Sequence, residues 1–405
     1  MIGYEAGLQI EQMLCQLADA TRIDGKIWRA AYTPQDKTAK KIMREWIEGL
    51  GLQYREDAVG NVYGRLPGKG QGTILTGSHL DTVKDGGKYD GALGVITGVA
   101  ALGYLKHSGF VPNRSLEVVG LMEEEGSRFA SSCQGSCAIC GTLRAEDMQE
   151  VGRDGVTLRE ALLDAGYQPE ALNTARRDDI CAVVELHIEQ GPVLEAENKQ
   201  IGIVDGIVGI ANYELTIQGS QNHAGTTSMA LRHDPVVAAA EFITESTRQM
   251  MEQSKSATLT FGKVQTFPGM QNVIADRAEL LIDLRDGSED ELEQDEKLLK
   301  HILKTIADKG FKTQLKQTQW SKSVKMDQGL IQLIESLCKE KKLAYKRMNS
   351  GAGHDSMVFG KVFPTAMIFV PSKGGISHNP AETTTVPDLQ TGFDLLCGVL
   401  KELSK

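Results

Sequence analysis

Histidine and carboxylate residues gather in four short segments that follow apolar stretches of the chain. The first, GSHLDTV, contains His79 and Asp81, and Asp90 follows eleven residues after His79 within YDGALG. Residues two apart on a strand point to the same side. A metal-binding histidine commonly gives its other ring N–H to a carboxylate, and Asp81 could do this directly or by orienting the loop. The segment is compatible with a metal site, although an H-x-D pattern alone is more often structural.

The other three segments carry the same residue types. MEEEGSRF contains Glu123, Glu124 and Glu125, ELHIEQG contains His187, and GGISHNPAE contains His378. Three adjacent carboxylates repel one another, so this run is either an exposed charged loop or a place where cations make the crowding tolerable. Each histidine alone is more often structural than a ligand. Four such groups at strand ends favour a ligand site, because ligands of open α/β sheets bind there.

The elements that would position these groups follow an α/β pattern. Strands are predicted at 53–64, 72–78, 114–123, 180–187 and 366–370. Helices are predicted at 7–18, 34–50, 94–107, 328–341 and 388–403, and helical segments fill 130–175. Alternation of strands and helices indicates an α/β layer with a central mixed, mostly parallel sheet. The length of 405 residues exceeds the ~250–300 at which one core stops growing, so two domains are expected.

The pattern changes near residue 210. Strands are predicted at 213–218, 257–264, 278–285 and 312–319, with helices at 235–253 and 290–310. Asp234-Pro235 is a strong start signal for the first of these helices. The order β-α-β-β-α-β is that of a ferredoxin-like α+β domain. This segment is therefore expected to form a compact domain inserted into the larger one.

Composition narrows the classes of protein to consider. Lys and Arg total 44 and Asp and Glu total 54, so the net charge is −10, which weighs against general binding to nucleic acid or to an anionic membrane. No apolar run approaches the ~18–20 residues of a membrane span. The N-terminus lacks the pattern of a secretory signal, so a cytoplasmic location is expected.

A cluster of cysteines allows two interpretations. Cys133, Cys137 and Cys140 could form a thiolate metal site, but no second Cys or His pair follows at zinc-ribbon spacing. SSCQGSCAICGTL also fits a small-residue helix in which free thiols act as small hydrophobes, and this structural interpretation is preferred. The histidines outside the four segments, His107, His233 and His301, are also interpreted as structural.

Taken in order, the segments resemble a known family. GSHLDTV, YDGALG, EEEGSRF, ELHIEQGPVLE, HAGTTSM, SGAGHDS and GGISHNPAE match the motifs of the di-metal aminoacylase/carboxypeptidase-type amidohydrolases, from about residue 10 to residue 400. Within that family the sequence looks like the subgroup of allantoate amidohydrolases, N-carbamoyl-L-amino-acid hydrolases and β-ureidopropionases. Each motif is modest alone, and the ordered set is highly specific.

The resemblance implies a set of metal ligands. His79 and His187 would bind one metal, Glu125 and His378 the other, and Asp90 would bridge both. A histidine at position 187, where the wider clan often has a carboxylate, marks the ureido-hydrolysing subgroup. Imidazole and carboxylate ligands suit Mn²⁺, Zn²⁺, Co²⁺ or Ni²⁺, and the resemblance favours Mn²⁺ with Zn²⁺ second.

The resemblance also assigns the remaining catalytic roles. Glu124 would be the general acid/base, and Asp81 would support the site. A metal pair about 3.5–4 Å apart lowers the pKa of bridging water and polarises a carbonyl. Glu124 would then take the water proton and deliver it to the leaving nitrogen.

Residues of the inserted segment would complete the site. Residues 1–210 and 326–405 would form the catalytic domain, and 211–325 the lid and dimerisation domain of a homodimer. His223 would stabilise the oxyanion from the partner subunit, and closure of the lid would complete the site. Substrate contacts are implied for Gln190, Asn272, Arg285, Gly353 and His354. Arg285 could bind a carboxylate bidentately, or it could pair with Asp283 or Asp286.

The substrate is expected to be allantoate. EEEGSRF stands where carbamoylases usually begin with DEEG, and GAGHD stands where they often have GAAHD. Gly353 could leave room for the second ureido group of allantoate. An N-carbamoyl-L-amino-acid hydrolase is the alternative, and a dipeptidase or aminoacylase is disfavoured by His187 and Asn272. An inactive binding protein on this fold would need a lost ligand or base, and a dehydrogenase would need the G-x-G-x-x-G motif that the sequence lacks.

Overall fold

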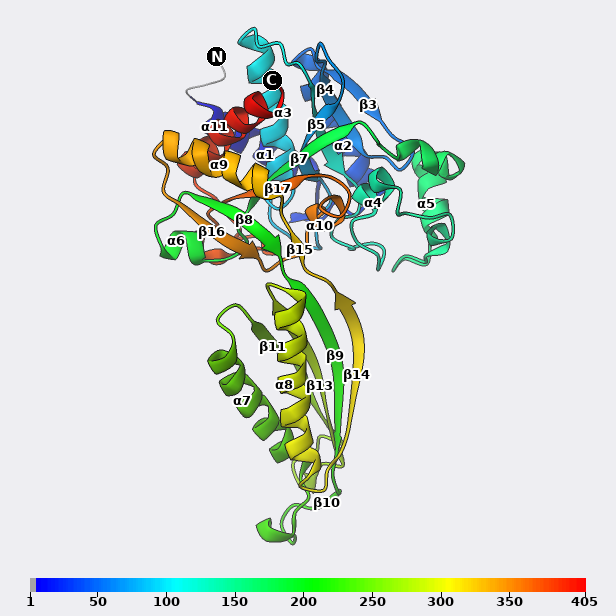
Figure 1. Cartoon of the computed structure of the whole chain (residues 1–405). Helices are drawn as coiled ribbons and strands as arrows, with labels where there is room; N and C mark the ends of the chain where they lie inside the picture. The colour runs from blue at the N-terminus through cyan, green and yellow to red at the C-terminus, as the bar shows by residue number, and fades with distance from the viewer. Residues whose placement is uncertain (1–4) are drawn as a thin grey trace. The chain divides into compact units, whose positions relative to one another are not determined.

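The computed structural model describes residues 5–405, which form two compact units. The larger unit consists of the chain up to Asp205 together with Lys325–Lys405, and the smaller unit is Gly206–Val324. Both are mixed α/β structures (Figure 1).

The larger unit is built on a nine-stranded mixed sheet of the described residues (Figure 1). Its strands are β3 (Gln53–Glu56), β4 (Val62–Leu66), β5 (Thr73–His79), β6 (Ser115–Leu121), β7 (Ile180–Ile188), β8 (Ile201–Ile207), β15 (Val324–Lys325), β16 (Tyr345–Ser350) and β17 (Thr365–Val370), and a separate hairpin joins β1 (Arg22–Ile23) to β2 (Lys26–Ile27). Its helices are α1 (Ala6–Ala20), α2 (Pro34–Gly49), α3 (Ala92–His107), α4 (Gln134–Cys140), α5 (Leu158–Ala165), α6 (Val193–Ala196), α9 (Gln328–Glu340), α10 (Ser356–Phe359) and α11 (Val386–Leu403).

Four central strands of this sheet are parallel. β17, β7, β5 and β6 are neighbours and run parallel, whereas β17 pairs with β8, and β4 with both β6 and β3, in antiparallel fashion. The sheet is therefore mixed, as predicted, with parallel pairs at its centre. The parallel strands end at one edge of the sheet, and the histidines and carboxylates of the sequence segments described above lie at this edge.

Helices cover both faces of the sheet. Leu186 of β7 contacts Gly392 of α11, whereas the Glu185 carboxylate before it accepts a hydrogen bond from Ser356 at the start of α10. Successive residues of a strand point to opposite faces, so α11 and α10 lie on opposite sides. α3 contacts α11 and therefore lies on the same side, and a side chain on Gly94 of α3 would come within 2.3 Å of the Leu186 carbonyl oxygen. Close contact between α3 and the sheet thus requires glycine.

One predicted strand is wrong, because residues 53–64 form a hairpin. The chain turns between β3 and β4, where Asp57 Oδ1 accepts hydrogen bonds from the main-chain N–H groups of Val59 and Asn61. The φ of Gly60 is +86°, which suits glycine. The aspartate side chain therefore stabilises a turn that the alternation of apolar residues hides.

The helices predicted across 130–175 are shorter than expected. α4 and α5 end at Gly141 and Gly166, both in the left-handed conformation, and residues 169–175 form a 3₁₀ helix. The predicted small-residue helix is α4. Its close packing depends on Gly135, where a side chain would come within 2.5 Å of the main-chain nitrogen of Met122.

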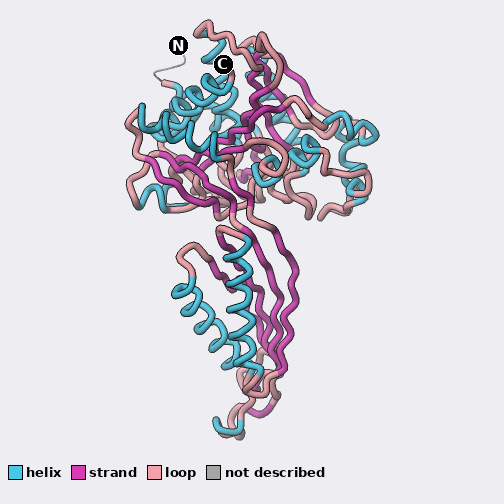
Figure 2. Tube along the Cα trace, in the orientation of Figure 1, coloured by secondary structure: helices cyan, strands magenta, loops and turns pink. Residues whose placement is uncertain are grey.

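The smaller unit has four long strands and two long helices on one face of the sheet (Figure 2). Its elements are β9 (Gly209–Gln218), β10 (Asn222–His223), α7 (Pro235–Gln253), β11 (Thr258–Phe267), β12 (Val273–Ile274), β13 (Arg277–Asp286), α8 (Glu289–Ala307) and β14 (Lys312–Ser321). The antiparallel strand order β11-β13-β9-β14 together with this element order is ferredoxin-like. α7 begins at Pro235, where Asp234 caps the N–H of Val236 at 3.0 Å.

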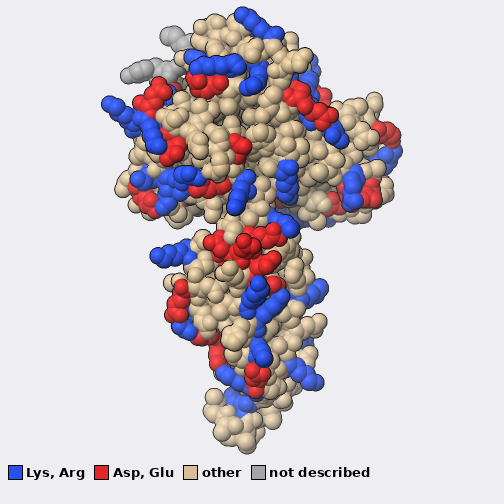
Figure 3. Space-filling view, in the orientation of Figure 1, with Lys and Arg blue, Asp and Glu red and all other residues tan. Residues whose placement is uncertain are grey.

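Surface charge is interspersed on the face shown in Figure 3, where Lys and Arg side chains lie among Asp and Glu side chains. No helix of the described residues is long and apolar enough to span a membrane.

Candidate metal centre

Parallel pairing brings three of the four sequence segments together. His79 is the last residue of β5, and it is paired in register with Leu121, the last residue of β6. His187 lies near the end of β7, which is parallel to β5. The loop after β6 begins with Met122 and continues into the three glutamates. Their side chains therefore meet at the carboxyl edge of the central strands.

Asp90 is the centre of this cluster. Its Oδ1 atom lies 3.1 Å from His187 Nε2 and 3.6 Å from His79 Nε2, and its Oδ2 atom lies 3.1 Å from His378 Nε2. His378 Nε2 is also 3.5 Å from Glu125 Oε2. Three sets of possible ligands result, and in each set the ligand atoms lie within 4.8 Å of one another. Two of them contain Asp90, namely His79–Asp90–His187 and Asp90–Glu125–His378, and the third is Glu185–His187–His354. The five sequence-predicted ligands thus form two groups that share Asp90.

Hydrogen bonds explain how two of the imidazoles are oriented. His79 Nδ1 lies 3.0 Å from the main-chain oxygen of Asp81, and His187 Nδ1 lies 2.9 Å from that of Ile188. A carbonyl only accepts, so each Nδ1 carries the proton and each Nε2 presents a lone pair to Asp90. The Gly91 N–H donates to His187 Nε2 at 3.2 Å, which agrees with this tautomer.

These groups fit divalent cations. The Nε2 lone pairs of His79 and His187 face the Asp90 carboxylate, and acceptors that face each other in a buried place need a cation between them. Burial would raise the pKa of Asp90, but its contacts with the imidazoles of His187, His378 and His79 hold it well below its usual value, so Asp90 is ionised. A mixed set of imidazole and carboxylate donors suits Mn²⁺, Zn²⁺, Co²⁺ or Ni²⁺.

Asp81 holds the loop of the glutamates rather than the His79 ring. Its Oδ1 and Oδ2 atoms accept the main-chain N–H groups of Glu124 and Glu125 at 3.2 and 3.1 Å, whereas Oδ1 is 3.7 Å from His79 Nδ1. Of the two roles expected for Asp81, orientation of the loop is the one supported by these hydrogen-bond distances.

Glu124 has the environment of a general base. Its carboxylate is buried, and Oε2 lies 3.6 Å from His79 Nε2. Burial raises the pKa of Glu124 well above its usual value, His79 opposes this, and Glu125 and Asp355 raise it further. A carboxylate with raised proton affinity next to the proposed ligands is suited to proton transfer.

Three further predicted contacts lie around the same cluster. Gln190 Nε2 donates to Asp90 Oδ2 at 2.9 Å, and Gln190 Oε1 is buried with no partner among residues 5–405. His354 is buried against the His187 ring at 4.6 Å and lies 3.0 Å from Ser350 Oγ through Nε2. Burial and then His187 hold the pKa of His354 well below its usual value. At Gly353 an added methyl group would meet only Met357 Sδ at 3.4 Å.

The smaller unit carries the other predicted residues. His223 Nδ1 accepts the Gly225 N–H at 2.9 Å, so the exposed ring presents an Nε2–H donor. The main-chain oxygen of Asn272 accepts the Ala224 N–H at 3.1 Å, which places Asn272 beside the His223 loop. Arg285 binds Asp283 through two hydrogen bonds of 2.8 and 3.0 Å. Of the alternatives open for Arg285, pairing with Asp283 is the one seen.

Two residues that position Asp90 were missed by the sequence interpretation. Glu382 Oε1 accepts the main-chain N–H groups of Tyr89 and Asp90 at 2.9 and 3.0 Å, and Glu382 Oε2 accepts from Ser377 Oγ at 2.9 Å. Both lie in the segment of His378. The spacing of four residues between His378 and Glu382 was the available signal, because it allows one loop to place a ligand and to hold the shared carboxylate.

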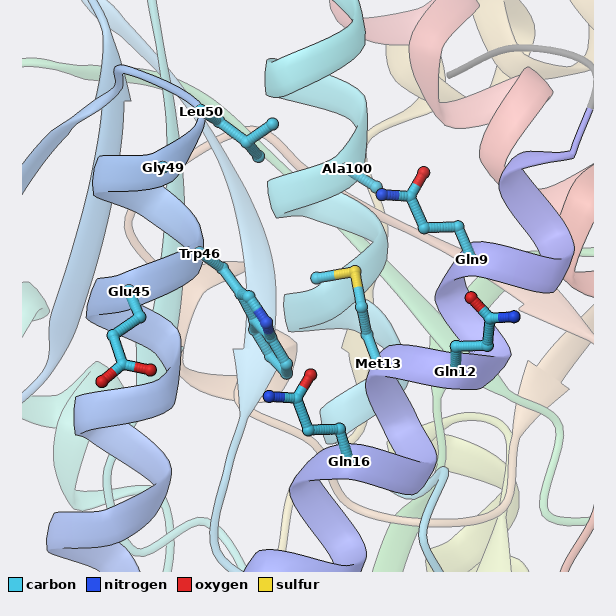
Figure 4. A pocket seen from close by; sticks show the side chains of 9 residues that line it. All are labelled: Gln9, Gln12, Met13, Gln16, Glu45, Trp46, Gly49, Leu50 and Ala100. Atoms are coloured by element: carbon cyan, nitrogen blue, oxygen red, sulfur yellow. The ribbon is translucent and has the colours of Figure 1, made fainter. Parts of the chain in front are cut away.

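A pocket of about 390 Å³ lies elsewhere in the larger unit, between α1, α2 and α3 (Figure 4). Its walls are formed by Gln9, Gln12, Met13, Gln16, Glu45, Trp46, Gly49, Leu50 and Ala100. It shares no residue with the two ligand groups, so this pocket is not part of the metal cluster.

Without metals, His378 is expected to make stability depend on pH. Its pKa is raised to about 9, because the hydrogen bond to Asp90 outweighs burial and Glu125 adds to the rise. The protonated form is favoured in the folded state, so this contribution is complete below pH 6.5 and is lost as the pH rises through about 9. Thermal melts of chelator-treated wild type and His378→Ala should be measured below and above this pH range. The melting temperature should fall less with rising pH in His378→Ala than in the wild type. Equal losses in both proteins would contradict the assignment.

Comparison with known proteins agrees with this fold and cluster. The model of peptidase family M20/M25/M40 matches residues 75–402, and the chain belongs to that family. The chain is 38% identical over 385 residues to an allantoate amidohydrolase of Bacillus subtilis, covering 94% of this chain and 93% of that protein. It is 36% identical over 384 residues to an N-carbamoyl-L-amino-acid amidohydrolase of a Pseudomonas species, covering 92% of each.

A solved structure matches over the whole chain. An amidase of the hydantoinase/carbamoylase family from Burkholderia multivorans superposes with a TM-score of 0.92 at 31% identity, covering 98% of both chains. The predicted resemblance to this group of amidohydrolases is therefore confirmed. The chain is an enzyme, a hydrolase of C–N bonds other than peptide bonds.

Proposed function

We propose that the protein is an allantoate amidohydrolase that uses two divalent metal ions to hydrolyse a ureido C–N bond. The observation that carries the proposal is the pair of ligand groups that share Asp90, with the buried Glu124 beside them. Addition of water to R–NH–CO–NH₂ yields R–NH₂, CO₂ and ammonia, and this reaction would place the protein in the breakdown of purine nitrogen in the cytoplasm.

The metals, Mn²⁺ or Zn²⁺, would be held by His79, His187, Glu125 and His378, with Asp90 shared. When bound, they lower the pKa of water and polarise a carbonyl group. Glu124 removes the proton of the attacking water and returns it to the leaving nitrogen. The Gln190 Oε1 atom, which has no partner among the described residues, is available to accept a ureido N–H.

Allantoate is preferred because of two sequence details, EEEG at 123–126 and Gly353. Neighbouring atoms leave room for a methyl group at residue 353, so packing does not require glycine there, and the free space suits a second ureido group. The alternative is an N-carbamoyl-L-amino-acid hydrolase, because relatives with that activity in their names are 36% and 35% identical to the chain.

The smaller unit is proposed to provide substrate contacts and the interface of a homodimer. Edge strand β11 and helix α7 expose apolar side chains, with Val264 51%, Val237 58% and Met251 76% exposed. Apolar residues beside an unpaired strand edge are typical of a surface that a second copy covers. Arg285 and Asn272 would bind the substrate carboxylate, and the Nε2–H of His223 would stabilise the oxyanion from the partner subunit.

The deciding assay compares two substrate classes. Purified protein loaded with Mn²⁺ is given allantoate, with ammonia as the product, and in parallel a panel of N-carbamoyl-L-amino acids, with the free amino acid as the product. The Glu124→Gln variant identifies contaminating activity. Ammonia from allantoate alone would support the proposal. Release of free amino acids with no reaction of allantoate would instead identify an N-carbamoyl-L-amino-acid hydrolase. No turnover of either substrate class would reject both functions.

Replacement of His223 by alanine is expected to reduce kcat by about 10²–10³-fold, which is the usual effect of removing one oxyanion donor. Metal content and melting temperature should stay near those of the wild type, because His223 is exposed and distant in sequence from the ligands. His233→Ala is the matched control, since His233 lies in the same unit and stacks on Phe311 at 3.9 Å. His233→Ala should lower the melting temperature but leave kcat unchanged. A normal kcat in His223→Ala would refute the proposed role of His223 in stabilising the oxyanion.

A further inference from the structure

Arg29 is an unusual residue because its guanidinium is buried without an ion pair. It follows β2, is 1% exposed, and takes part in none of the ion pairs found among residues 5–405. Burial lowers its pKa to about 10, while the carboxylates of Asp81, Asp36, Glu382 and Asp90 raise it in part. Arg29 therefore remains charged at neutral pH. An unpaired buried charge costs several kcal/mol, so this position calls for an explanation.

Arg29 donates one side-chain hydrogen bond to Thr21 Oγ1 at 3.3 Å, and its other hydrogen bonds reach one short segment. Its Nε–H donates to the Leu80 carbonyl at 2.6 Å, and its main-chain N–H donates to Thr82 Oγ1 at 2.9 Å. The Thr82 N–H returns a bond to the Arg29 carbonyl at 3.2 Å. Arg29 is thus hydrogen-bonded to the residues on both sides of Asp81.

Asp81 is hydrogen-bonded to residues of both ligand groups of the metal cluster, so its position affects both. Its main-chain oxygen fixes the Nδ1 atom of His79, and its carboxylate fixes the main-chain N–H groups of Glu124 and Glu125. His79 belongs to one ligand group and Glu125 to the other. A shift of residues 80–82 would therefore move a ligand of each group and the proposed base together.

We propose that Arg29 is a positioning residue of the metal centre. It fixes residues 80–82 so that His79 and Glu125 meet their metals in the correct place, and its charge offsets part of the repulsion among the carboxylates of Asp81, Asp90 and Glu382. This inference rests on the proposed di-metal function. A residue that only fills the core would act differently, because a buried arginine can be replaced by an apolar side chain of similar length at little cost.

The test uses the full-length protein with Mn²⁺ and measures metal binding separately from turnover. Arg29→Met is expected to fold and to bind Mn²⁺ about 10–100-fold more weakly, the usual effect of losing a group that orients metal ligands. At saturating Mn²⁺ its kcat should remain reduced with KM little changed. The visible absorption of the Co²⁺-substituted variant should differ from that of the wild type, since that spectrum reports ligand geometry. Arg29→Lys keeps the charge and should recover part of the affinity.

Two further variants keep the test decisive. Arg177→Met removes a half-buried arginine that pairs with Glu117 and Asp179, and it should lower stability without changing metal affinity. If Arg29→Met does not fold, Thr21→Val removes the side-chain partner of the Arg29 Nη1–H group and should weaken Mn²⁺ binding in the same direction. Wild-type affinity and Co²⁺ spectrum in the folded variants would overturn the role of Arg29 alone. A wild-type protein that binds no metal would overturn the proposed function, and this inference with it.

Discussion

Replacement of Glu124 by glutamine is expected to lower kcat by about 10²–10⁴-fold, the contribution of a positioned general base, while both metals stay bound. Glutamine has the size of glutamate but cannot take a proton. The main-chain N–H of residue 124 still reaches Asp81, because that bond involves no side-chain atom of Glu124. The loop should therefore keep its conformation, and the loss should appear in kcat rather than in KM.

The neighbouring glutamate provides the contrast. Glu125→Gln changes a side chain whose Oε2 atom lies 3.5 Å from His378 Nε2 in the second ligand group. This variant should lose metal, and activity should recover in part when Mn²⁺ is raised. Metal analysis and steady-state kinetics on both variants separate the two roles. Loss of metal from Glu124→Gln, or full turnover in it, would contradict the assignment of the base.

The sequence predicted the positions of the long helices well, because their start signals are local. Asp234-Pro235 places the start of α7 at Pro235, as the structure has it. Turns stabilised by side chains were harder to predict, since Asp57 interrupts a run that otherwise alternates like a single strand. β8 and β16 were missed as well. β8 contains Gly202 and Gly206, and β16 is the mostly polar YKRMNS, so neither has the apolar pattern from which a strand is predicted.

The residues of the proposed metal centre could be picked out from the sequence, but the groups that orient them could not. His79, Asp90 and His378 stand out because their chemistry is rare and their motifs are specific. Arg29 has no such signal, since it acts through hydrogen bonds to residues more than fifty positions away. Glu382 holds Asp90 across 292 residues of sequence. Contacts of this kind arise only when the strands are aligned, so the three-dimensional structure was needed to find them.

Replacement of Asp90 by asparagine is expected to disturb both metal positions at once. Asp90 contacts His187 and His79 through Oδ1 and His378 through Oδ2, and no other residue of 5–405 belongs to both the group around His79 and the group around Glu125. The amide of asparagine carries no charge, and its nitrogen cannot bind a metal. We expect at most roughly one Mn²⁺ per chain at concentrations that load the wild type fully, since affinity depends on deprotonated ligands.

The His187→Ala variant serves as the comparison, because His187 faces only Oδ1 of Asp90. It should lose the metal of the first group and keep the metal of Glu125 and His378. Calorimetric titration with Mn²⁺ counts the sites in each protein. A wild-type stoichiometry in Asp90→Asn would show that the two groups do not share this carboxylate.

Stability provides a second readout for Asp90→Asn that does not depend on turnover. A ligand that binds only the folded state stabilises it by RT ln(1 + [L]/Kd), about 2.7 kcal/mol at one hundred times Kd. Mn²⁺ should therefore raise the melting temperature of the wild type and raise that of Asp90→Asn much less. Without metal, Asp90→Asn should also be the less stable protein, because it loses the contacts with His187, His378 and His79 that hold the pKa of Asp90 well below its usual value. A rise in melting temperature with Mn²⁺ in the wild type that is largely lost in Asp90→Asn is what a metal centre requires, because an ordinary buried ion-pair network would not respond to Mn²⁺.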